Sequence, residues 1–347
     1  MLRIAAGVLC VLTGCATPAV APGAGAGPAL QRHDYHRVIM GSPCRLVAWA
    51  PDAAAADEGA RAAFARLGQV DEALSDWMRA SEVRRLPSRA GTPVAIGPDL
   101  RAALAASMDF SRDSGGAFDV TVGPLTKLWR AARAAGTPPP ASDVAAARVR
   151  VGWQHVRLDA AGYAADTDGV ELDFGGIGQG FGADAALEAL RAAGIACAMV
   201  DLSGDVAAMG TPPGSEGWRI ALDDGGAAGG APTLLLADAA VTTSGDRFQH
   251  LDIAAPDGTS RRASHILDPR TGQPIATRTS VTVVARRATD ADALATALSV
   301  LGPDGSAALL ARHPDAAARW AHERPDGTIE VRTTPNWPGP ARLAPGR

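Results

Sequence analysis

Residues 173–184, DFGGIGQGFGAD, are the most informative stretch of the chain. Glycines recur through it, the apolar segment GVEL precedes it, and the helix-like segment AALEALRAAG follows it. Because glycine has no side chain, a glycine-rich backbone can approach a phosphate closely. The stretch therefore predicts a site for the diphosphate of a dinucleotide or a flavin, placed between a strand and a helix.

One interpretation of this stretch is the dinucleotide-binding fingerprint of a Rossmann unit, G-x-G-x-x-G/A. Residues 180–185 fit the pattern, and Asp201 ends the next apolar segment about 20 residues further on, as the fingerprint requires. Two features oppose it. Asp173 would put a carboxylate beside the diphosphate, and no second set of strand–helix–strand patterns follows in the chain.

The composition of the chain is that of a globular protein. Of its 347 residues, 47% are hydrophobic and 20% are charged, which is enough apolar material for a sizeable core. The formal net charge is −4, from 33 basic and 37 acidic residues, and the basic residues form no run. This charge pattern argues against nucleic acid as a partner.

The N-terminus has the pattern of a bacterial targeting segment. Arg3 precedes an apolar run at residues 4–12, which is shorter than the roughly 20 residues that span a bilayer. The run ends in LTGC, which resembles a lipobox with Cys15 as the lipidated residue. Residues 1–15 are thus predicted to be a lipoprotein signal peptide, and residues 16–33, rich in Pro, Ala and Gly, a flexible tether. An ordinary signal peptide with a coincidental Cys15 is the alternative.

The remaining chain predicts one domain at residues 34–333 and an irregular tail at 334–347. Apolar periodicity predicts helices at 53–74, 99–113, 181–193 and 289–301. Strands are predicted at 38–50, 155–159, 170–174, 196–201, 218–222, 280–285 and 328–332. Helices and strands in this mixed order indicate an α+β (mixed α/β) fold.

Two polar residues of the segment TDADALATALSVL suggest a metal site. Asp292 and Thr296 stand four residues apart, on one face of the predicted helix. A carboxylate and a hydroxyl in this arrangement offer two of the oxygen ligands that Mg²⁺ prefers. The alternative is a solvated aspartate and a threonine bonded to its own helical turn.

Two loops and two cysteines add further candidates. In GGAFDVTVGPLTKLW, residues 115–129, Phe118 could stack on a flat ring and Asp119 could accept hydrogen bonds from it. In SHILDPRTG, residues 264–272, polar side chains crowd His265, which is either structural or catalytic. Cys44 and Cys197 could form one disulfide or remain two buried thiols.

These segments, in this order, resemble the ApbE family, the FAD:protein FMN transferases. The resemblance runs from MGS at residues 40–42 through LSDW at 74–77, the two loops above, DFGGIGQGFGAD, DLSGDVAAMG and TTSGD to DADALATALSVLG. It implies a single-domain fold of mixed α/β type related to the T-fold. It also implies Mg²⁺ as cofactor and FAD as substrate. FMN is joined through a phosphoester to a Thr or Ser of an acceptor protein, such as a subunit of a redox complex, and AMP is released.

The resemblance also assigns roles to residues. The residues implied to surround FAD are Met40, Trp77, Ala117, Phe118, Asp119, Asp173, Gln179 and Leu267. The side chains of Asp292 and Thr296, with a backbone oxygen near Gly176, would hold the metal, and His265 would deprotonate the acceptor hydroxyl.

The chain departs from the family pattern at three places. Gln179 is neutral where many members have a charge, and Ala295 replaces a third carboxylate, so a weaker or more hydrated metal site is expected. Ser203-Gly204-Asp205 replaces a double glycine before the aspartate.

The expected function is an FMN transferase anchored by lipid on the periplasmic side of a bacterial membrane. The family favours the inner membrane, and Ala16 after the cysteine does not exclude the outer one. Two alternatives stay open from the residues alone: an FAD pyrophosphatase that releases free FMN and AMP, and a non-catalytic FAD-binding lipoprotein.

Overall fold

The computed structural model of the chain describes residues 29–87, 89–91, 93–222, 232–245, 250–254, 260–276, 278–324 and 326–338. The predicted signal peptide with Cys15, most of the predicted tether and the end of the tail lie outside these residues. In the part of the chain that is described, no helix combines the length and hydropathy needed to cross a membrane.

An eight-stranded antiparallel sheet forms the centre of the fold, in the order β1-β2-β5-β6-β9-β14-β15-β16. Its strands are β1 (Gln31–Ile39), β2 (Ser42–Ala50), β5 (Cys197–Leu202), β6 (Asp205–Met209), β9 (Ala239–Ser244), β14 (Thr279–Ala285), β15 (Ala317–Glu323) and β16 (Ile329–Thr333). A Rossmann unit requires parallel strands beside its glycine-rich turn. The antiparallel pairing therefore rules out the Rossmann interpretation.

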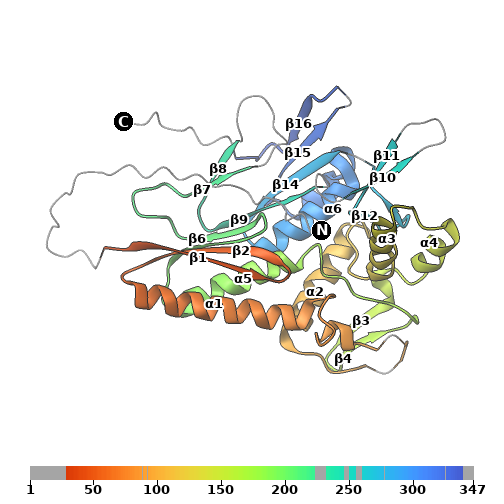
Figure 1. Cartoon of the computed structure of the whole chain (residues 1–347), viewed down its shortest axis with the longest axis horizontal. Coiled ribbons are helices and arrows are strands. Elements are labelled where there is room, and N and C mark those ends of the chain that lie inside the picture. The colour runs from red at the N-terminus through yellow and green to blue at the C-terminus, as the bar shows by residue number, and fades with distance from the viewer. Residues whose placement is uncertain are drawn as a thin grey trace.

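Three helices pack together against one face of this sheet: α1 (Ala53–Leu74), α5 (Gly178–Ala192) and α6 (Ala288–Gly305). Figure 1 shows α1 and α5 running along the sheet, with α6 beside them. The predicted apolar face of α1, from Phe64 to Leu74, is buried in this main core. The hairpin β7 (Trp218–Ala221) and β8 (Thr233–Leu236) covers a smaller core that includes Val47 and Met199.

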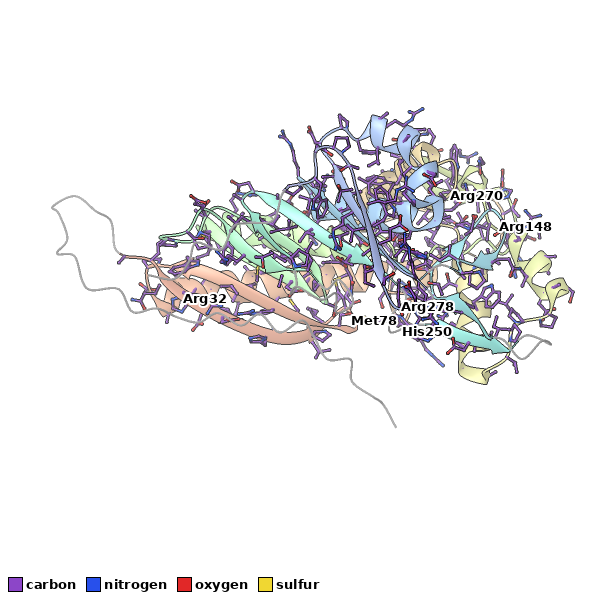
Figure 2. The ribbon with its side chains drawn as sticks, turned by 90° about the horizontal axis from the view of Figure 1, so that it is seen from above. Arg32, Met78, Arg148, His250, Arg270 and Arg278 are labelled. Carbon is purple, nitrogen blue, oxygen red and sulfur yellow. The ribbon has the colours of Figure 1, made fainter. Side chains whose placement is uncertain are left out.

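Most of the remaining elements gather at one end of the molecule (Figure 1). They are α2 (Pro98–Asp113), α3 (Gly123–Ala135), α4 (Ala141–Arg148), β3 (Val156–Asp159), β4 (Gly162–Ala165), β10 (His250–Ala254), β11 (Ser260–Ser264), β12 (Leu267–Asp268), β13 (Gln273–Pro274) and the 3₁₀ helices Val83–Arg85 and Trp153–His155. Figure 2 shows Arg148 and Arg270 together at this end, far from Arg32 in β1.

Two strand predictions are wrong. Residues 38–50 form a hairpin instead of one strand, because Met40 and Gly41 turn the chain with φ values of 52° and 69°. Its first strand begins at Gln31, so residues 31–33, assigned to the tether, belong to the sheet. Residues 170–174 form no strand: they make one isolated bridge, from Glu171 to Val122, before the glycines begin.

The two cysteines of the domain are both free and buried. In the ladder between β2 and β5, Cys44 lies opposite Leu202, whereas Cys197 lies opposite Trp49. This register separates the two sulfur-bearing residues by roughly 17 Å along the strands. A disulfide needs Cα atoms within about 7 Å, so the structure excludes one.

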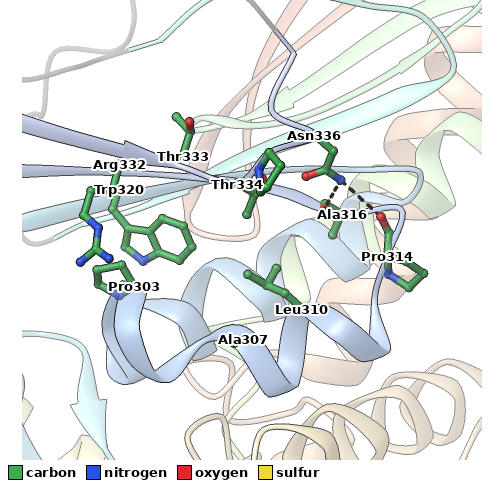
Figure 3. Close-up of a pocket in the computed structure, with 11 residues that line it drawn as sticks. Pro303, Ala307, Leu310, Pro314, Ala316, Trp320, Arg332, Thr333, Thr334 and Asn336 are labelled. Atoms are coloured by element: carbon green, nitrogen blue, oxygen red, sulfur yellow. Dashed lines mark hydrogen bonds between the residues drawn. The ribbon is translucent and has the colours of Figure 1, made fainter.

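The described part of the tail is irregular in structure but packs on the domain. The Thr334 backbone N–H donates to the Ala318 carbonyl at 2.9 Å, and the Asn336 amide donates to the Ala316 carbonyl at 3.0 Å. These residues border a cavity of about 520 Å³ against Trp320 and the short helix α7 (Ala307–Arg312), as Figure 3 shows. None of the predicted site residues lines this cavity.

Candidate active site

Three glycines of the opening stretch lie inside helix α5, which begins at Gly178, three residues before the predicted start. A Cβ added at Gly180 would lie 2.2 Å from the Ala288 carbonyl oxygen and 2.8 Å from the Asp292 Cβ. One added at Gly182 would lie 2.8 Å from the sulfur of Met40. These two glycines therefore allow close packing of α5 on its neighbours, which leaves Gly175, Gly176 and Gly178 to approach a phosphate.

Replacing Gly180 with alanine is expected to push α5 and α6 apart, since the new methyl group would overlap a backbone oxygen that cannot rotate away. The free energy of unfolding should fall by about 2 kcal/mol or more, even though alanine favours a helix by about 1 kcal/mol. Urea unfolding measures this change. Gly178→Ala is the matched control, because its new Cβ would meet Phe174 at an ordinary 3.5 Å. Equal stability of the two variants would contradict this role of Gly180.

The structure brings the predicted metal-site residues together. Asp292 is 4% exposed, and its Oδ2 accepts a hydrogen bond of 3.0 Å from the Gly180 N–H. Burial raises the pKa of Asp292 to about 7, against the lowering effect of that bond. A Cβ added at Gly176 would lie 2.8 Å from the Thr296 hydroxyl oxygen. Gly176 and Thr296 are thus in contact, one helical turn along from Asp292.

A second buried carboxylate, Asp205 at the start of β6, was not predicted as a site residue. Burial and the nearby Asp292 carboxylate raise the pKa of Asp205 well above its usual range. Two buried carboxylates so close together are costly unless a cation offsets their charge. Among the described residues, no group of three or more His, Cys, Asp and Glu could hold a metal ion. A site here therefore depends on hydroxyl and backbone oxygens as well, which are donors that suit Mg²⁺.

Asp184, the last residue of the opening stretch, fixes α6 in place. Its carboxylate accepts hydrogen bonds from the backbone N–H groups of Ala288 and Thr289, at 2.8 and 3.0 Å, and from the Thr289 hydroxyl at 2.6 Å. Helix α6 has no side-chain cap from its own N-cap residue, Arg287. The role of Asp184 was not predicted, although its i, i+4 spacing from Gly180 puts both residues on the face that meets α6.

The turn between β1 and β2 borders the start of α5. The Gln179 side-chain amide donates a hydrogen bond of 2.8 Å to the Ser42 hydroxyl. Met40, in a left-handed conformation that costs a non-glycine residue about 1–3 kcal/mol, packs against the main core. The neutral Gln179 thus holds the turn that contains one predicted FAD contact, Met40.

Asp173 and Trp77 lie in a second polar cluster. The Asp173 carboxylate accepts a hydrogen bond of 2.8 Å from the Gly175 N–H, and burial and the Asp76 carboxylate raise its pKa. The Arg130 guanidinium donates to Asp76 at 2.9 Å and lies 4.0 Å from the centre of the Trp77 ring. Trp77 is 71% exposed, so its indole faces solvent apart from this contact with Arg130.

The side chains of Ala117, Phe118 and Asp119 are all buried. Phe118 is buried in the main core, with its ring edge-on to Phe110 at 6.5 Å between centroids. The Asp119 carboxylate, whose pKa burial raises, accepts hydrogen bonds from Thr121 and from the Trp153 N–H at 2.9 Å. Both side chains are thus engaged within the protein, and the contact of these residues with FAD stays a prediction.

The loop with His265 packs on α3. Leu267 is buried in a small core with Leu125 and Trp129, and its contact with FAD stays a prediction. The Trp129 indole N–H donates to the Gly272 carbonyl at 2.9 Å. His265 itself is half-buried directly after β11, and its role as a base stays a prediction.

This arrangement suits a diphosphate ligand with a flat ring. Buried carboxylates and the Thr296 hydroxyl lie against glycine backbone at one point, and the exposed Trp77 indole lies against the Arg130 guanidinium. Such a set can hold a divalent cation against the phosphates and a ring against the indole.

Known proteins resemble this chain over most of its length. The model of a family described as the ApbE family matches residues 40–320. The chain is 33% identical over 329 residues to the FAD:protein FMN transferase of Treponema pallidum, covering 88% of this chain and 87% of the relative. It is 30% identical over 308 residues to one from Klebsiella pneumoniae, covering 86% of this chain and 85% of the relative.

Solved structures give the same likeness. The apo form of the flavinyl transferase ApbE of Pseudomonas stutzeri superposes with a TM-score of 0.76 at 32% identity, over 88% of this chain and 96% of that one. The ApbE protein of Thermotoga maritima superposes with a TM-score of 0.74 at 28% identity, over 86% of this chain and 96% of that one.

Proposed function

The chain belongs to the ApbE family, and on this premise we propose that it is an Mg²⁺-dependent FAD:protein FMN transferase. It attaches FMN to a Thr or Ser hydroxyl of an acceptor protein and releases AMP. The observation that carries the proposal is the convergence of Asp292, Thr296 and Gly176 at the start of α5. The acceptor is proposed to be a subunit of a redox complex.

The proposed reaction exchanges the phosphoanhydride bond of FAD for a phosphoester bond to the acceptor. The acceptor oxygen forms a bond to the phosphorus of the FMN half, the bond from that phosphorus to the bridging oxygen breaks, and AMP leaves with the bridging oxygen. His265 takes the proton of the acceptor hydroxyl, which makes that oxygen a stronger nucleophile. Backbone N–H groups of the glycine-rich loop orient the diphosphate.

Asp292, Thr296 and a backbone oxygen near Gly176 would hold Mg²⁺. When bound, the ion would offset charge on the phosphoryl oxygens. The fit rests on the buried carboxylates of Asp292 and Asp205. Among the described residues, no cationic side chain contributes to the pKa of either carboxylate. Gly176 has no side chain to block the approach of a ligand to the Thr296 hydroxyl.

The proposal is tested by mass spectrometry of a flavin-acceptor domain after incubation with the protein, FAD and Mg²⁺. We expect the mass of FMN to be added at one Thr or Ser, with AMP released in equal amount. AMP release that is independent of the acceptor would indicate a pyrophosphatase instead. Recovery of intact FAD, with folded protein and a cognate acceptor, would indicate a flavin-binding protein.

Location is a further part of the proposal: the chain is anchored by a lipid on Cys15, at the periplasmic side of a bacterial membrane. The lipobox-like LTGC sequence supports it. Cys15→Ser is expected to move the protein from the membrane fraction to the soluble fraction in cells, without changing FMN transfer by the purified domain. Retention of the variant in the membrane fraction would count against lipid anchoring.

A further inference from the structure

Arg130, in the second turn of α3, lies where three features of the candidate site meet. Its guanidinium donates a hydrogen bond of 2.9 Å to the Asp76 carboxylate. The same group lies 4.0 Å from the centre of the Trp77 ring, well within cation–π distance. Its positive charge also acts on Asp173, whose pKa it lowers against the larger raising effect of burial.

The residues next to Trp77 in the chain do not hold its indole in one orientation. Helix α1 ends at Leu74, and Trp77 follows in a bend with 71% of its surface exposed. An exposed indole on a bend samples several rotamers, and a ligand that stacks on it must immobilise it. The guanidinium covers one part of the ring, and its ion pair with Asp76 ties the group to the residue before Trp77.

From this geometry we propose that Arg130 is a positioning residue for FAD: it holds the Trp77 indole ready to stack on a flat ring of the substrate. The guanidinium suits this role because its plane can stack on an indole while its N–H groups bind a carboxylate, which an ammonium does less well. The proposal rests on FAD being the substrate of this site, and it adds a residue that need not touch the substrate.

The expected effect falls on FAD binding. Arg130→Gln should raise the KM for FAD about three- to tenfold, the range expected when one large side chain must be ordered during binding. The kcat should stay within about twofold, since the ring contact is the same in ground state and transition state. Trp77→Ala should raise the KM by as much or more, and Arg130→Gln should add little in that background, because both changes remove one interaction.

Arg112→Gln is the matched control. Arg112 is also a helical arginine with an ion pair and a ring contact: it pairs with Asp109 at 3.0 Å and lies 5.8 Å from the centre of the Trp153 ring. Neither Arg112 nor Asp109 is a predicted site residue, so the KM for FAD should not change. Arg130→Lys keeps the charge near Asp173 but lacks the flat group, and is expected to restore only part of the affinity.

A second measurement needs no FAD. Iodide quenching of the Trp77 emission is measured as the difference between each protein and its Trp77→Phe counterpart. It should increase in Arg130→Gln and stay unchanged in Arg112→Gln. Unchanged quenching would overturn the proposal. An equal effect of Arg130→Gln on the KM for FAD in the presence and absence of Trp77 would also overturn it, because Arg130 would then act through Asp173. If the parent protein transfers no FMN, the proposed function fails. The quenching measurement still tests the contact between Arg130 and Trp77 in that case.

Discussion

Asp292→Asn is expected to lower the rate of FMN transfer by about a thousandfold, the most severe loss among the variants considered. Stabilisation of developing charge by a bound cation is worth several kcal/mol, and each 1.4 kcal/mol or so corresponds to a factor of ten in rate. Asparagine keeps an oxygen to accept the hydrogen bond from the Gly180 N–H, so the packing of α5 on α6 should persist. The loss should therefore reflect chemistry and not unfolding.

The same substitution should affect thermal stability in the opposite direction from activity. In the metal-free protein Asp292 and Asp205 are buried together, and replacing one charge by an amide removes their repulsion. The melting temperature without Mg²⁺ should stay the same or rise, and the increase that Mg²⁺ gives to the parent protein should disappear. Asp290→Ala, on the same helix and half-buried, is the control that should keep both activity and the Mg²⁺ response. A normal Mg²⁺ response in Asp292→Asn would remove Asp292 from the ligand set.

His265→Ala is expected to slow transfer by about a hundredfold or more, the usual contribution of a positioned general base. FAD affinity should change little, because the proposed proton comes from the acceptor hydroxyl and not from FAD. Single-turnover kinetics with saturating acceptor, together with FAD titration, separates the two effects.

His250→Ala supplies the control for His265. His250 lies on the same hairpin, directly opposite Ser264 in the β10–β11 register, and is also half-buried. Its loss should leave the transfer rate nearly unchanged. If His265→Ala instead abolishes FAD binding while the hairpin remains folded, His265 is a cofactor contact and the base lies elsewhere.

Much of the fold follows from local patterns. The apolar positions of residues 53–74 predict helix α1 with its observed bounds, and most strand predictions lie within a few residues of the observed strands. The α+β class and the ApbE-type fold are confirmed by the mixed elements and by the solved structures. The turn within residues 38–50 does not follow from the sequence. A non-glycine residue such as Met40 seldom occupies a left-handed turn, so it gives no turn signal.

The site follows less completely from the sequence than the fold does, because its contacts join residues that are distant in the chain. The sequence predicts one phosphate-binding role for the whole glycine-rich stretch, whereas Gly180 and Gly182 make contacts with α6 and with the turn between β1 and β2. Those partners are distant in the chain, so the glycines give no local sign of which neighbour requires them. The same holds for Phe118, whose burial against Phe110 depends on how α2 packs.

The cap that Asp184 places on α6 has a consequence for the order in which the protein matures. The carboxylate and the backbone N–H of Ala288 are separated by 104 residues of chain. As the polypeptide grows from its N-terminus, α5 is complete long before the helix that it must hold exists. A nascent chain that stops before residue 288 therefore lacks both the partner of Asp184 and Asp292. Assembly of the site must wait for long-range closure late in folding, so a prematurely ended chain is not expected to transfer flavin.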